Sequence, residues 1–191
     1  MARTTAEKIL DAAETRFAET GYSATSLGEI ADDVGIRTPS LYKHFATKKK
    51  LYEAVMERLL DPYVEMLQTL LLPPKDAAQA QRNVDAVVRH YYERPNLARL
   101  VQHAALAGGD EIDMLMRRWF NPLFRRAAQL TPKSPHQVFI VMAFHDLMSG
   151  YVTNAPLHRR LLGADPLSKR MREQHLTFLK SLASALWQVA M

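Results

Sequence analysis

Cysteine is absent from this chain of 191 residues, and glycine is scarce, with 7 residues. The lack of cysteine excludes disulfides, thiolate metal sites and thiol catalysis. No apolar run is long enough to span a membrane, because a spanning helix needs about 20 consecutive apolar residues. The N-terminus also lacks the basic and apolar segments of a secretory signal. We therefore expect a cytoplasmic protein with no membrane segment.

Strand-like alternation of apolar and polar residues is missing as well, and no internal repeat is found. Hydrophobic residues make up 48% of the chain and charged residues 24%, a mixture typical of a globular protein with a buried core. Apolar residues recur instead at helical spacing, as Ile9, Ala13 and Phe17 do near the N-terminus. The pattern predicts an all-α fold of about nine helices.

Capping signals mark the first two helices. Thr4 and Ser26 each stand three residues before a glutamate, which is the spacing of a capping box at a helix start. Gly21 and Gly35 are expected to end the first and second helices, since glycine readily adopts the left-handed conformation of a C-terminal cap.

Proline and threonine mark the helices that follow. Thr38 is expected to cap a third helix that has Pro39 at its first position, where a missing N–H costs nothing. Thr47 is expected to start a fourth helix, and Pro62 should kink or interrupt it. The remaining breaks predict five more helices, over residues 76–93, 96–107, 111–129, 135–155 and 167–190.

The second and third helices have the dimensions of a helix-turn-helix. Each is about eight residues long, and a tight turn at Gly35 and Ile36 joins them. The second helix of such a pair can enter the major groove of DNA. A simple helical hairpin in a bundle core has the same dimensions, so the spacing alone leaves both interpretations open.

The charge around this pair favours nucleic acid. The net charge is only +5, but five basic residues and no acidic one lie between Arg37 and Tyr52. Lys48, Lys49 and Lys50 fall in the first turn of the fourth helix, where cations are unfavourable by ~0.3–1 kcal/mol each. A phosphate at this helix start would reverse the penalty. The basic residues are Arg37, Lys43, Lys48, Lys49 and Lys50.

Side chains of the third helix are candidates for DNA contacts. Arg37, Thr38 and Ser40 stand at its start and are best placed to reach base edges. Tyr42 also suits core packing with an exposed hydroxyl, and a lone histidine is more often structural. The residues expected to press against the phosphate backbone are Tyr42, Lys43 and His44.

The order and spacing of these residues resemble a known family. Residues 17–36 (FAETGYSATSLGEIADDVGI) and 38–45 (TPSLYKHF), followed by Thr47, Lys48 and Leu51, are similar to the start of the TetR family of bacterial transcriptional regulators. The likeness covers about the first fifty-five residues. Gly28 departs from it, because the family often has a larger residue there.

The resemblance implies a fold and a mode of action. It implies a DNA-binding domain over residues 1–50 and a ligand-binding and dimerisation domain over residues 51–191. Thr25 or Ser26 would cap the second helix against a phosphate, Tyr42 and His44 would lie near phosphate, and Lys48 would contact DNA. It also implies a dimer that loses DNA affinity when a small molecule binds.

The last two long helices are candidates for the dimer interface. Two apolar helices from each subunit can build a four-helix bundle across a two-fold axis. The same stripes would equally suit the core of their own subunit. They comprise Val138, Val141, Phe144, His145, Met148 and Val152, and then Met171, His175, Phe178, Leu182, Ala185 and Val189.

An apolar pocket is expected in the C-terminal part. Large soft side chains gather in the predicted helix 111–129, although such stripes are usually ordinary core. An apolar cavity with a few polar groups would suit a hydrophobic or amphipathic ligand. The candidate ligand-binding residues are Met66, Tyr91, His103, Met116, Phe120, Phe124, Met142, His145 and Tyr151.

Two other classes of function were compared with a regulator. An enzyme would need an ordered site, yet no two histidines stand three or four residues apart, and no phosphate loop or nucleophile motif occurs. A helical interaction module without DNA binding leaves the lysine-rich helix start unexplained. We therefore expect a non-enzymatic repressor without metal or cofactor, which binds a palindromic DNA operator as a homodimer and is released by a small effector.

Overall fold

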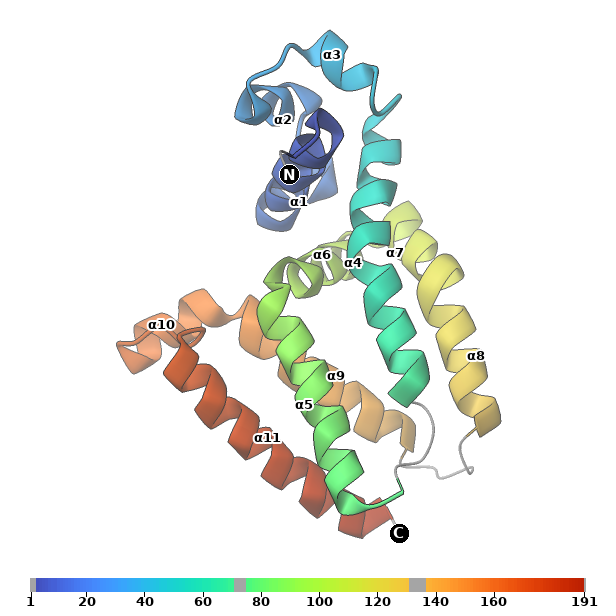
Figure 1. Cartoon of the computed structure of the whole chain (residues 1–191), viewed down its shortest axis with the longest axis vertical. Helices are drawn as coiled ribbons and strands as arrows, with labels where there is room; N and C mark the ends of the chain where they lie inside the picture. The colour runs from blue at the N-terminus through green and yellow to red at the C-terminus, as the bar shows by residue number, and fades with distance from the viewer. Residues whose placement is uncertain (1–2, 71–74, 131–136, 191) are drawn as a thin grey trace.

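The computed structural model describes residues 3–70, 75–130 and 137–190, and this part of the chain consists of helices without any strand. The prediction of an all-α fold is confirmed. No helix in the described ranges is both long and apolar enough to cross a membrane. A small group of N-terminal helices sits at one end of the molecule, and α4 runs from it into a larger helical body (Figure 1).

The N-terminal group comprises α1 (Thr5–Ala24), α2 (Leu27–Val34) and α3 (Thr38–Tyr42). The predicted capping box at the start of α1 is present, with Glu7 N donating to Thr4 Oγ1 at 3.2 Å and Thr4 N donating to Glu7 Oε2 at 2.7 Å. Gly21 interrupts α1 near the predicted end, with non-helical backbone angles φ of 82° and ψ of 168°. A last helical turn follows this kink and continues to Ala24.

Helix α4 (Lys48–Leu70) joins the two parts of the molecule. Pro62 was expected to kink or interrupt this helix, and it does not interrupt it, because α4 runs through it. A proline inside a helix costs about 3 kcal/mol. Burial offsets this cost, since Leu59, Leu60 and Tyr63 beside it are almost fully buried.

One hydrophobic core runs through both parts. Phe17 of α1 meets the ring of Tyr52 of α4 edge-on, with centroids 5.1 Å apart, and Tyr22 packs against the same tyrosine at 4.8 Å. Polar contacts reinforce this junction. Arg58 of α4 donates to Asp11 of α1 at 2.7 Å and to Glu14 at 2.5 Å. The N-terminal helices are therefore fixed to α4 by apolar and ionic contacts together.

The larger body contains the remaining helices. Helix α5 packs against α11, and α6 packs against α9 and against α1. The predicted break over residues 156–166 contains a further helix, α10, which the sequence analysis missed because Pro156 stands in its first turn. The elements are α5 (Ala77–Glu93), α6 (Pro95–Ala107), α7 (Gly109–Leu115), η1 (Met116–Phe120), α8 (Asn121–Leu130), α9 (Gln137–Thr153), α10 (Ala155–Leu162) and α11 (Lys169–Ala190).

The predicted helix over residues 111–129 is divided by the π-helical turn η1 between α7 and α8. A π turn is wider than an α turn and often marks a functional position. Here it presents two side chains to α4. Trp119 Nε1 donates to Asp61 Oδ1 at 2.6 Å, and Arg118 pairs with Glu57 at 2.5 Å. These contacts fasten η1 to the middle of α4.

Candidate nucleic-acid interface

A glycine turn fixes the angle between α2 and α3. Gly35 has φ of 76° and ψ of 33°, and its N–H bonds back to the end of α2. Ile36 N donates to Ala31 O at 3.0 Å, which completes a glycine-type helix C-cap. Leu41 is fully buried and anchors α3 from below. The turn and this anchor set the direction of the short third helix.

Helix α3 presents its polar side chains outward. Arg37, Lys43 and His44 are exposed, and the Tyr42 side chain is 51% exposed. Thr38 does not cap the helix as predicted. Arg37 occupies the N-cap position without a side-chain bond. The structure thus brings Arg37, Thr38, Ser40, Tyr42, Lys43 and His44 together on one short segment.

The start of α4 has the predicted cap and three lysines in different settings. Thr47 Oγ1 accepts a hydrogen bond from Lys50 N at 3.1 Å. The Lys48 ammonium turns back towards α1, donates to Ser23 O at 3.2 Å, and lies 4.5 Å from the centre of the Tyr22 ring. Lys50 pairs with Glu53 at 2.8 Å, whereas Lys49 is exposed and has no partner among the described side chains. Burial lowers the pKa of Lys48.

The two candidates that precede α2 separate clearly. Ser26 is exposed and caps α2, since its Oγ accepts from Glu29 N at 3.2 Å. The Glu29 carboxylate in turn accepts a hydrogen bond from Ser26 N at 2.8 Å, and this bond lowers the pKa of Glu29. Thr25 is only 3% exposed, and its hydroxyl donates to Gly21 O at 2.8 Å. Ser26 is therefore the residue that caps α2, whereas the Thr25 hydroxyl is buried at the end of α1.

An ion pair braces α2 against α1. Arg16 Nε lies 2.5 Å from Asp33 Oδ2, and its second nitrogen lies 2.6 Å from Oδ1. Arginine and carboxylate therefore meet through two parallel bonds, the most directional geometry that they adopt. The hydrogen bonds from Arg16 lower the pKa of Asp33. This pair keeps α2 aligned behind α3.

Two of the nine candidate ligand residues meet in the larger body. Tyr91 Oη lies 2.9 Å from His145 Nδ1 and 3.1 Å from Tyr63 Oη. Burial raises the pKa of Tyr91 well above its ordinary value and lowers the pKa of His145. The three groups form a buried polar chain that joins α4, α5 and α9.

The other candidates are distributed more widely. Met66 and Phe120 pack against the core, and Met116 of η1 is half-buried. Phe124 and Met142 are 47% and 52% exposed. Tyr151 belongs to a separate aromatic cluster, in which its ring stacks on His175 with centroids 3.7 Å apart.

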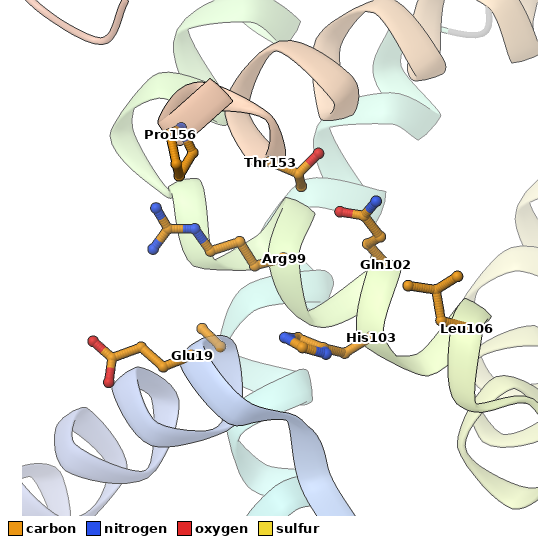
Figure 2. A pocket seen from close by; sticks show the side chains of 8 residues that line it. Glu19, Arg99, Gln102, His103, Leu106, Thr153 and Pro156 are labelled. Atoms are coloured by element: carbon orange, nitrogen blue, oxygen red, sulfur yellow. The ribbon is translucent and has the colours of Figure 1, made fainter. Parts of the chain in front are cut away.

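His103 lines a surface pocket of about 290 Å³ at the meeting of α1, α6 and the junction of α9 with α10 (Figure 2). No other candidate ligand residue borders it. Sequence reasoning missed Arg99 and Gln102, because neither belongs to a motif and only the packing of α6 brings them there. The lining residues are Ala18, Glu19, Arg99, Gln102, His103, Leu106, Thr153 and Pro156.

The predicted dimer stripes fall partly inside the subunit. Met148 and Val152 of α9 are buried in their own core, as the alternative interpretation expected. Phe178 of α11 is 58% exposed, and Met142 and Leu147 of α9 are exposed on a different face. The side chains of Val138, Val141, Phe144, Ala185 and Val189 lie outside the described residues.

Within the described ranges, no group of three histidine or acidic side chains is placed to hold a metal ion. The side chains at α3 and at the start of α4 instead carry hydroxyl, basic and aromatic groups. Such groups hydrogen-bond phosphates and base edges.

Residues 9–55 match the family of bacterial regulatory proteins named tetR. Among curated proteins, the HTH-type transcriptional activator FasR of Mycolicibacterium smegmatis is 39% identical over 75 residues, which is 39% of this chain and 34% of FasR. The negative transcriptional regulator IcaR of the Staphylococcus aureus biofilm operon icaADBC is 46% identical over 55 residues, 29% of this chain and 30% of IcaR. The similarity therefore spans about a third of the length of these relatives. Both are named as regulators of transcription, in agreement with the prediction of a non-enzymatic protein.

Solved structures resemble the whole fold. A transcriptional regulator from Aquifex aeolicus VF5 has a TM-score of 0.62 at 18% identity, over 94% of this chain and 99% of its own length. A TetR-like regulator from Rhodococcus sp. RHA1 has a TM-score of 0.59 at 21% identity, over 96% of both chains. At these identities the likeness concerns the fold, which is thus shared from end to end.

Proposed function

We propose that this chain is a ligand-responsive repressor that binds a palindromic operator as a homodimer, since residues 9–55 match the tetR family of bacterial regulatory proteins. The proposal depends on one observation. The side chains of Arg37, Tyr42 and His44 are exposed at and beside α3, and none of them forms a side-chain hydrogen bond within the described part of the chain. A polar and basic surface of this kind, carried on a braced scaffold, suits duplex DNA.

Each side chain of this surface has a proposed role. Arg37 reads a guanine edge through two hydrogen bonds, and Thr38 and Ser40 contact neighbouring bases. The side chains proposed to hold the phosphate backbone are Ser26, Tyr42, Lys43, His44 and Lys48.

Lys48 has a double role in this proposal. An ammonium group has three N–H donors, and the bond to Ser23 O uses one of them. The remaining donors are available to a phosphate above the start of α4. Lys48 would therefore link the DNA backbone, the end of α1 and α4 in one contact.

The proposed dimer uses α9 and α11. Both helices belong to the proposed ligand-binding and dimerisation domain, residues 51–191, which follows the DNA-binding domain, residues 1–50. A two-fold axis would place two copies of α3 in successive major grooves, ~34 Å apart. Phe178→Glu should then produce monomers in light scattering after gel filtration. Phe124→Glu is the matched control, because Phe124 is similarly exposed but lies on α8. Monomers for the unmodified chain, or dimers for Phe178→Glu, would count against this interface.

The proposed effector is a small hydrophobic or amphipathic molecule that favours one arrangement of α4. Tyr91 and His145 join α4 to α5 and α9 through Tyr63, so a ligand that displaces them moves the helix that carries Lys48. The ligand acts only through its different affinity for the two arrangements.

FasR is named as an activator and IcaR as a negative regulator. A reporter fused to the selected operator therefore decides the sign, and repression is expected. We expect a regulator that binds the bacterial chromosome to act in the cytoplasm.

The direct test is selection of duplexes from a randomised pool at low ionic strength, followed by titration of the selected duplex. Arg37→Ala should relax the sequence preference at one position. Lys48→Ala should weaken binding to all duplexes alike and reduce the salt slope by about 1. Lys75→Ala is the matched control, since Lys75 is exposed at the start of α5. No enrichment of any duplex would refute the proposal.

A further inference from the structure

The pocket between α1 and α6 has the chemistry of a small-molecule site. The geometry points to an effector site for a small organic monoanion with an apolar body, such as an aromatic carboxylate. This inference rests on the proposed function, because it names the class of effector and a place where the effector acts. The site is separate from the buried chain of Tyr63, Tyr91 and His145.

Arg99 supplies the affinity for a negative group. Its side chain is half-buried, and it forms no hydrogen bond or ion pair with any residue that the structure describes. A guanidinium that is partly withdrawn from water gains most from an anion, and its planar fork matches a carboxylate through two parallel bonds. Gln102 beside it is also without a described partner and offers amide donors. Thr153 donates its hydroxyl to Ser149 O at 2.9 Å, so it is left as an acceptor.

Glu19 limits the charge of the ligand. Figure 2 shows its carboxylate on the same side of the pocket as the Arg99 guanidinium, yet the two do not form an ion pair. Glu19 is exposed to solvent, so it does not need a counter-ion, but its charge opposes a dianion. One positive and one negative side chain therefore favour a ligand with a single negative charge.

Apolar groups line the rest of the pocket. Leu106 is 80% exposed at its edge, and Ala18 and Pro156 face the same space. The volume of about 290 Å³ lies just below the range of ligand pockets, ~300–1,000 Å³. A body of the size of one aromatic ring fits these walls.

The position of the pocket connects a ligand to the DNA-binding helices. Its walls come from α1 on one side and α6 on the other. His103 packs against Gly21, the kink of α1, where a Cβ atom would lie 3.2 Å from His103 Nδ1. The α1–α6 contact is therefore tight next to the pocket, and a molecule held by Arg99 and covered by Ala18 prefers one spacing of the two helices. Such a preference shifts the orientation of α1 and of the α2–α3 pair that follows it.

Calorimetric titration of the full chain tests the site without DNA. Phenylacetate is the probe, and phenylacetamide is its neutral analogue of the same shape. We expect phenylacetate to bind, and to bind at least tenfold more weakly to Arg99→Met and to Arg99→Lys than to the unmodified chain. Arg126→Met, which changes an exposed arginine of α8, should bind within twofold of it. Phenylacetamide should bind at least tenfold more weakly, and Glu19→Gln should bind phenylacetate more tightly.

A second arm measures duplex affinity with and without phenylacetate. The expected result is weaker duplex binding in the unmodified chain and no effect in Arg99→Met. The inference is overturned if phenylacetate does not bind, if binding ignores Arg99, if phenylacetamide or inorganic phosphate binds equally well, or if duplex affinity does not respond. If the chain binds no duplex at all, the proposed function fails and the inferred effector role fails with it, while the calorimetry separately shows whether the pocket takes a carboxylate.

Discussion

The hydroxyl of Tyr91 is the centre of the buried polar chain, and its removal in Tyr91→Phe should destabilise the protein. It contacts Tyr63 Oη at 3.1 Å and His145 Nδ1 at 2.9 Å. Each lost hydrogen bond costs about 1 kcal/mol net, and a buried polar group left without a partner costs ~1–3 kcal/mol. The free energy of unfolding should therefore fall by about 2–4 kcal/mol.

Thermal unfolding followed by circular dichroism measures this effect. For a chain of this length, 1 kcal/mol shifts the Tm by roughly 2–4 °C, so a loss of about 2–4 kcal/mol should lower the Tm by roughly 4–16 °C. Tyr42→Phe is the matched control, because the Tyr42 side chain is 51% exposed on α3 and should lose DNA affinity without losing stability. A Tm for Tyr91→Phe within about 2 °C of the unmodified protein would refute the reasoning, as would an equal loss in the control.

Three further predictions concern stability. Gly35→Ala should lower the unfolding free energy by ~1–2 kcal/mol, because a φ of 76° is unfavourable for alanine even though no neighbouring atom would contact the added Cβ. Gly28→Ala should instead raise the unfolding free energy by ~0.5–1 kcal/mol, since Gly28 is helical and its added Cβ meets nothing closer than 3.8 Å. Urea titration of the two variants should show opposite shifts, and equal shifts would contradict the assignment of the turn. Burial lowers the pKa of His175 to about 4, below its ordinary value of about 6.5, so the unfolded chain binds an extra proton between these values. Stability should therefore fall as the pH drops from about 6.5 towards 4, and His175→Gln should reduce that slope in melts at several pH values; an unchanged slope would exclude His175 as a source. Trp119→Phe removes the 2.6 Å bond to Asp61 and should lower the Tm by several degrees, whereas no change would mean that η1 is held to α4 by packing alone.

Local signals predicted the N-terminal helices well, because each depends on a few neighbouring residues. The capping boxes of Thr4 and Ser26 and the glycine turn at Gly35 all form as predicted. The errors arose where tertiary packing outweighs local preference. Pro62 is held inside α4 by buried neighbours, and a further helical turn follows the kink at Gly21, which packs against His103.

The candidate site divides in the same way. The α3 surface follows from the order of residues along one short segment, so its members could be named from the sequence. The C-terminal residues depend on which helix faces lie together, and a periodic stripe does not specify its neighbour. Of the predicted ligand residues, Tyr91 and His145 are in contact, whereas Met142 is exposed. Arg99, which lines the surface pocket, was not predicted.

Contact between α3 and duplex DNA is the central claim. Amide hydrogen exchange of the full chain, with and without a duplex selected from the randomised pool, measures that contact directly. We predict slower exchange over residues 26–50 in the complex, with little change in α5. Unchanged exchange over residues 26–50 in a chain saturated with duplex would contradict the account.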